Sequence, residues 1–308
     1  MLTMKTYLGW KVDFANPPGA PAFAGPDSVS WRVFKNPVAL GVGGVAAVLL
    51  EFADARIRSG VWDHSTYKSD PIGRSERTAM AAMVGVYGPQ DAARRVIHGV
   101  TNMHARVAGQ TPSGEHYRAT DPDLLDWVSA TAGWGFLNAY DAFVAPLDAE
   151  EKTRFYAEAE PVAALYGVRH SPANDSDFMA MLHQRIARFE PHPIVREFLD
   201  IVESGPGALG LPSFVRRAMA RASVSLLPPS VREKLELGSA YELSSLERRA
   251  LKAMGALAER VPIAAAPPAQ ACKRLGLPLD FLYRSQAAQR RLLADWRAPP
   301  SATPSAFR

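Results

Sequence analysis

Apolar residues recur at three- and four-residue intervals along most of this 308-residue chain. That spacing places them on one face of an α-helix. Strand-like alternation is rare, and the sequence has no repeat of fixed period. The pattern therefore predicts an all-α fold made of a single, mostly helical domain.

Proline, glycine and capping residues mark where the predicted helices begin and end. Residues 28–34 alternate weakly and predict a short strand or an extended lead-in, and residues 262–268 read as a linker. We expect an irregular N-terminal lead-in over 1–27, the helical domain over 28–296 and a loose tail over 297–308. The predicted helices span 37–60, 70–87, 90–109, 124–144, 148–165, 175–189, 194–203, 212–222, 230–237 and 244–260.

Composition narrows the class of protein. A single cysteine, Cys272, excludes an internal disulfide framework and a Cys-rich zinc site. The longest apolar run, Val38 to Leu50, has 13 residues, whereas a membrane span needs about 20. We therefore expect a buried helix there, and, because no secretory signal is seen either, a cytoplasmic protein.

Charge is spread unevenly along the chain. The net charge is +4, but residues 205–308 carry a clear excess of Lys and Arg. Such a segment suits nucleic acid, acidic lipid or an anionic cofactor, or simply forms solvated helix faces. The basic residues lack the interleaved aromatics of single-strand binders, so no nucleic-acid partner is expected.

Several common motifs are absent or out of place. The segment 41–46 matches a dinucleotide-binding pattern, but it follows Pro37 rather than a strand, and helix packing or a flat ligand explains its glycines better. The chain has no Glu-x-x-His pair, no His-Glu-x-x-His and no Gly-x-Ser-x-Gly. These absences remove the usual di-iron, zinc-protease and hydrolase interpretations.

One histidine lies where a leucine would be expected. His104 falls on the apolar stripe of the predicted 90–109 helix, whereas His98 points toward its polar side. A buried imidazole needs a partner, which can be a hydrogen-bond acceptor, a metal or a haem iron. The other members of the stripe are Ala93, Ile97, Val100 and Val107.

A second group of polar residues precedes this helix. Arg74 and Thr78 are i, i+4 neighbours, and Arg77 lies three residues after Arg74. Two arginines so close together suit a shared anion such as a carboxylate or a haem propionate, although a solvated helix N-terminus has the same pattern. His64 is either part of this site or a surface-loop histidine.

The order of these motifs resembles that of the MpaB-type oxygenases, a family that includes the rubber oxygenases. The resemblance runs from about residue 28 to residue 168. It rests on the ordered segments Ser30-Trp31-Arg32, Gly60 to Ser65, Asp70 to Arg74, Arg77-Thr78, Met103 to Gly109, Gly114 with Tyr117 and Ala119, Asp121-Pro122 with Trp127-Val128, and Tyr156 to Glu158.

The resemblance implies one haem b in a pocket between helices packed as in globins, with His104 as its metal ligand. It places Arg74, Arg77, Thr78 and His64 at the open side of the iron as catalytic residues. The residues expected to contact the cofactor are His104, Arg106, Gly43 and Tyr117. The implied activity is that of a haem-dependent oxygenase, which acts with dioxygen on a hydrophobic, unsaturated substrate of terpenoid or fatty-acid type.

Three positions depart from the family pattern. Arg77 stands where the rubber oxygenase has a lysine, and arginine does not lose its proton to ligate iron. Asp54 and Ser129 stand where relatives often have histidine. These changes predict a different pocket and a different substrate.

Two other functions remain open from the sequence. One is a non-catalytic protein that binds haem or an apolar ligand. The other is a metal-free helical enzyme in which His64 and His104 are the acid–base residues.

Overall fold

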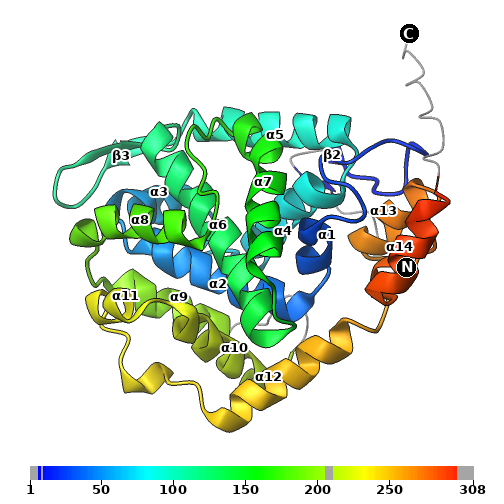
Figure 1. The fold of residues 1–308 in the computed structure, drawn as a ribbon. Helices are drawn as coiled ribbons and strands as arrows, with labels where there is room; N and C mark the ends of the chain where they lie inside the picture. Colours follow the sequence, from blue (N-terminus) through cyan, green and yellow to red (C-terminus); the bar gives the residue numbers. More distant parts are fainter. Residues whose placement is uncertain (1–5, 8–9, 205–210, 297–308) are drawn as a thin grey trace.

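Two long helices, α2 (Pro37–Phe52) and α6 (Pro122–Phe143), pack against each other at the centre of the molecule (Figure 1). The computed structural model describes residues 6–7, 10–204 and 211–296. At the helix crossing, a methyl group on Gly43 would lie 2.6 Å from the carbonyl oxygen of Gly135. Glycine at both positions lets the two backbones approach this closely.

The other helices surround this pair, and the all-α prediction is confirmed. The strands of the described residues form two small antiparallel pairs, β1 (Thr6–Tyr7) with β2 (Trp10–Lys11) and β3 (Ala108–Gln110) with β4 (His116–Arg118). The remaining helices are α1 (Val29–Phe34), α3 (Ala55–His64), α4 (Pro71–Tyr87), α5 (Gln90–His104), α7 (Ala149–Leu165), α8 (Asp175–Arg185), α9 (Pro193–Ser204), α10 (Ser213–Leu226), α11 (Pro229–Lys234), α12 (Ser245–Ala258), α13 (Pro267–Arg274) and α14 (Gln286–Ala294), with short 3₁₀ turns at Ile186–Arg188, Ser239–Tyr241 and Phe281–Tyr283.

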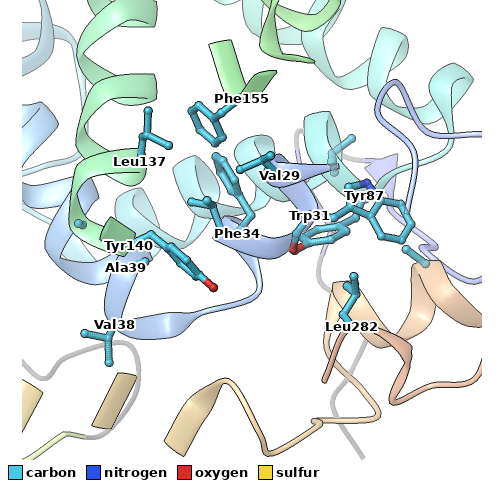
Figure 2. Close-up of a cluster of buried hydrophobic side chains, with 14 of the residues drawn as sticks. Val29, Trp31, Phe34, Val38, Ala39, Tyr87, Leu137, Tyr140, Phe155 and Leu282 are labelled. Carbon is cyan, nitrogen blue, oxygen red and sulfur yellow. The ribbon is translucent and has the colours of Figure 1, made fainter. Parts of the chain in front are cut away.

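In the part of the chain that the structure describes, buried apolar side chains form two clusters. The first joins α1, α4 and α6 to the C-terminal helices, and Figure 2 shows part of it around Trp31, Phe34 and Tyr140. The second lies beneath the C-terminal end of α2, where the rings of Trp134 and Phe178 stack with their centroids 4.8 Å apart. The candidate site described below lies beside this second cluster.

The prediction of a strand or extended lead-in over 28–34 is wrong, because this segment forms α1. Ser28 caps the helix by accepting a hydrogen bond from the backbone N–H of Trp31. The carboxylate of Glu158 on α7 accepts hydrogen bonds from the backbone N–H groups of Val29 and Ser30, at 3.1 and 2.8 Å. A distant side chain thus satisfies the free donors of the first turn, which local sequence could not reveal.

The single helix predicted over 37–60 is also wrong, because it breaks between α2 and α3. Asp54 caps α3 by accepting from the backbone N–H of Arg56. Asp54 also pairs with Phe189 in an isolated β-bridge. The chain turns at this point because Asp54 supplies both a cap and a contact with a segment far along the sequence.

The helix predicted over 90–109 ends five residues early, at His104. The chain then turns into the β3–β4 hairpin, which projects from the edge of the molecule (Figure 1). Gly109 lies in β3, where a side chain would meet the hydroxyl of Tyr117 at 2.7 Å. Its role is therefore close packing in the hairpin rather than ending a helix.

The C-terminal part of the helical region differs from the prediction. The predicted linker over 262–268 runs into α13, which begins at Pro267, and α14 was not predicted. The buried guanidinium of Arg274 donates hydrogen bonds to the carbonyls of Phe14, Ala20 and Tyr87, at 2.6 to 2.8 Å, so the N-terminal segment is fastened to α13. The expected tail over 297–308 lies outside the described residues, and the three-part division of the chain stays a prediction.

Candidate functional site

Polar side chains from four helices, and one from the segment between α3 and α4, gather at the C-terminal end of α2. We call this group the polar cluster. Its members are Glu51 on α2, Tyr67 before α4, Arg74 and Thr78 on α4, His104 at the end of α5 and Thr131 on α6.

Arg74 is the cation that its neighbours share. Its guanidinium donates to the hydroxyl of Thr78, which lies one helical turn further along α4. The same guanidinium lies 5.9 Å from the ring centroid of the buried Tyr67, within the range of a cation–π contact. Its positive charge also acts on both Glu51 and His104. Arg74 and Thr78 therefore lie together, as the resemblance implied.

His104 is the last residue of α5 and is half-buried. Burial lowers the pKa of its imidazole, and the charge of Arg74 lowers that pKa further. No hydrogen bond joins the ring to another side chain or backbone group in the described part of the chain. The lowered pKa favours the neutral imidazole, the form that ligates metals, and His104 has no hydrogen-bond partner among the described residues. His98, on the same helix, is exposed as predicted.

Glu51, Tyr67 and Thr131 are the members of the cluster that the sequence analysis did not predict, and Glu51 is the titratable group among them with a pKa near neutrality. Burial raises the pKa of its carboxyl to about 7, although the charge of Arg74 and a hydrogen bond from Thr131 lower it in part. That hydrogen bond joins Thr131 Oγ1 to Glu51 Oε1 at 3.3 Å. The signal was present in the sequence, because an acidic residue directly after an apolar helical run opposes the helix dipole.

Two of the predicted site residues lie in a separate pair. The Nε2 atom of His64, at the end of α3, lies 3.1 Å from the hydroxyl oxygen of the buried Tyr117 on β4. Their rings meet edge to face. Within the described ranges, no hydrogen bond or ion pair connects this pair to the polar cluster.

The remaining predicted residues lie elsewhere. Arg77 turns away from Arg74 and donates to Asp70 and Thr66, at 3.3 and 2.6 Å. Arg106 is exposed, just after α5. Gly43 lies eight residues before Glu51 on α2, which is about 12 Å along the helix. Its contact with Gly135 explains the glycine by helix packing, and its role toward a cofactor stays a prediction.

Asp54 and Ser129, the departures from the family pattern, have different surroundings. Asp54 is buried and paired with Arg56, as described above, whereas Ser129 is half-buried on α6. The fold explains the aspartate at position 54, because its side chain caps α3 and pairs with Arg56. Nothing in the structure explains Ser129.

Comparison with known families identifies the class. Residues 31–260 match the family described as "ER-bound oxygenase mpaB/B'/Rubber oxygenase, catalytic domain". The chain therefore belongs to this family of oxygenase catalytic domains, and the matched range includes the whole polar cluster. No match was found among curated proteins or among solved structures.

No group of three or more His, Cys, Asp or Glu side chains suited to a metal ion occurs in residues 6–7, 10–204 and 211–296. None of the helices in those ranges combines the length and hydropathy that a membrane span requires.

Proposed function

We propose that this chain is a haem b oxygenase in which His104 binds the iron. The observation that carries the proposal is the His104 imidazole, which is half-buried, without a hydrogen-bond partner among the described residues and held neutral by burial and by Arg74. A haem iron takes four of its ligands from the porphyrin, so a single protein histidine is enough to hold it. The donor set of the cluster therefore fits haem better than a free metal ion.

Three members of the polar cluster act directly on the cofactor or on dioxygen in this proposal. His104 binds iron through a ring nitrogen. Arg74 and Thr78 are hydrogen-bond donors near it, suited to orient dioxygen or to hold a propionate. When bound, haem supplies the redox-active iron that reacts with dioxygen.

Glu51 adds a group that can hold or release a proton near neutral pH. Its carboxyl has a raised pKa and lies within the electrostatic reach of Arg74. A carboxyl of this kind is suited to general acid–base chemistry on the substrate. Membership of a family that includes rubber oxygenases favours a hydrophobic substrate, with carbon–carbon double bonds as the expected target.

His64 and Tyr117 form a second donor pair at the β3–β4 hairpin. We propose that this pair contacts the cofactor or the substrate from the hairpin side. Arg77 and Arg106 have weaker support, because Arg77 is engaged by Asp70 and Thr66 and Arg106 faces solvent.

The test is the absorbance spectrum of protein produced with an ample supply of haem. We expect a Soret band in the wild type and in His98→Ala, a matched control on the exposed face of the same helix. The band should be lost or displaced in His104→Ala. A wild type without a Soret band would overturn the proposal, and an unchanged spectrum in His104→Ala would overturn the ligand assignment. Dioxygen uptake with polyenes then separates an oxygenase from a haem carrier.

A further inference from the structure

Helix α12 carries an apolar stripe on its exposed face as well as one on its buried face. The buried face contacts the core through Leu251 and Gly255. The outer stripe repeats at four- and three-residue steps, so its members lie in one row along the helix. It consists of Leu246, Ala250, Ala253 and Leu257, all of them exposed.

Two more exposed apolar residues come directly after the helix in the sequence. Val261 and Ile263 follow α12, with 51% and 55% of their surfaces exposed, while Leu246 and Leu257 are 72% and 61% exposed. These four side chains are most of the large apolar side chains that the described residues leave in solvent. Helix α12 lies along one outer edge of the molecule (Figure 1), and every member of its outer stripe is exposed. A row of this kind marks a surface that binds something apolar.

The acidic side chains of α12 are half-buried, whereas most of its basic side chains face solvent. Glu247 and Glu259, the acidic side chains of the helix and its cap, are half-buried and pair with Arg221 and Lys35, at 2.8 and 3.0 Å. Arg249, Lys252 and Arg260 are exposed, and in the described part of the chain none of them pairs with a carboxylate. The solvent side of α12 is therefore apolar with a basic flank. An amphipathic face of this composition fits an anionic membrane surface.

We propose that α12, together with the segment after it, binds the surface of an anionic lipid bilayer. Leu246, Leu257 and Ile263 would enter the boundary between headgroups and acyl chains, and the basic flank would meet the lipid phosphates. A second copy of the chain fits less well. In an antiparallel two-fold pairing of two α12 helices, the basic flank of one helix faces the basic flank of the other. The membrane surface complements both the apolar stripe and its charge.

The experiment is co-sedimentation of the full chain with vesicles. One set contains phosphatidylcholine alone, and the other an equimolar mixture of phosphatidylcholine and phosphatidylglycerol. We expect binding to the anionic vesicles that weakens as salt is raised, because salt screens exposed charges. Leu257→Ser with Ile263→Ser, and Arg249→Glu with Lys252→Glu, should each weaken that binding about tenfold.

The matched control is Arg290→Glu with Arg291→Glu on α14, which changes the net charge equally at two exposed arginines away from the stripe. We expect this variant to bind anionic vesicles nearly as well as the wild type. The altered residues are exposed, so thermal unfolding should stay close to that of the wild type in every variant. Wild-type protein that stays in the supernatant, or equal loss of binding in the control, would overturn the proposal. A concentration-dependent dimer that Leu257→Ser dissociates, without vesicle binding, would assign the face to a second copy instead.

Discussion

Two carboxyl groups three residues apart, Glu51 and Asp54, have opposite electrostatic surroundings. Asp54 is 2% exposed, and burial alone would raise its pKa, but hydrogen bonds and charges from Arg56, together with Arg185, hold the pKa below its ordinary value. Glu51 has one hydroxyl partner and a guanidinium that is not hydrogen-bonded to it, so burial raises its pKa to about 7. The paired carboxylate stabilises a chain reversal, whereas the poorly paired one is left with a proton to exchange.

The fully paired region extends beyond Asp54. Arg56 and Arg185 both also bind Asp123 at the start of α6, and the guanidinium of Arg185 lies 5.2 Å from the ring centroid of Trp127. This group joins the α2–α3 corner to α6 and α8. In the polar cluster, by contrast, the Arg74 guanidinium donates a hydrogen bond to Thr78 and to no other side chain among the described residues. The ion-paired group around Asp54 is therefore a structural network, whereas the side chains of the polar cluster remain available to ligands.

Asp54→Ala should give the largest effect of this comparison. It removes an N-cap, which is typically worth about 1 kcal/mol, and it leaves two buried arginines short of a partner, which costs about 3 kcal/mol. We expect the free energy of unfolding to fall by about 4 kcal/mol in urea titrations. Asp54→Asn keeps an oxygen that can cap α3 and should lose less. A loss below 1 kcal/mol for Asp54→Ala would show that the network is not structural.

Glu51→Gln should change how stability depends on pH. The pKa of Glu51 is raised in the fold from 4.5 to about 7, so the wild type loses stability relative to the variant as pH rises through that window. Above pH 7 the variant should be more stable by about 2 kcal/mol, less than the full shift because the residue is only half-buried. The contribution of Asp54 to stability has the opposite pH dependence. It is present above the ordinary pKa of the carboxyl and is lost as pH falls through the lowered pKa of the folded state. Parallel stability curves for wild type and Glu51→Gln between pH 4.5 and 8 would contradict the assignment.

Arg74→Gln should give the smallest change, in the titration of His104. Arg74 lowers the pKa of His104, so removing its charge should raise that pKa in the haem-free protein, as followed by NMR of the ring protons. Arg77→Gln is the matched control, because Arg77 binds Asp70 and Thr66 instead. An equal shift of the His104 resonance in both variants would show that Arg74 has no particular relation to His104.

Helix starts were the part of the fold that the sequence predicted best. The capping boxes at Asp148 with Glu151 and at Ser244 with Glu247 are present, and α7 and α12 begin there. A cap acts between residues three apart, so local sequence contains it in full. Helix ends at Phe52 and His104 were missed, because they depend on Phe189 and on the β3–β4 hairpin.

The site was predictable in part. The family order pointed to Arg74, Thr78 and His104, and the structure brings these three into one cluster. Spacing along α4 could not show that Arg77 turns back toward Thr66, since a long side chain reaches either direction from its helix. The position of Glu51 directly after an apolar run is a local signal, but the burial that raises its pKa arises only once the chain has folded.

The sequence by itself determined that this chain is helical, where most helices begin and to which oxygenase family it belongs. Those properties follow from apolar period, capping and motif order, which act over a few residues or persist along the chain. Only the tertiary structure decided that residues 29–34 form a helix, that Asp54 is an ion-paired cap and that the pKa of Glu51 is raised to about 7. Each depends on the solvent exposure and the charges that other helices bring to a residue, and these exist only once the chain has folded.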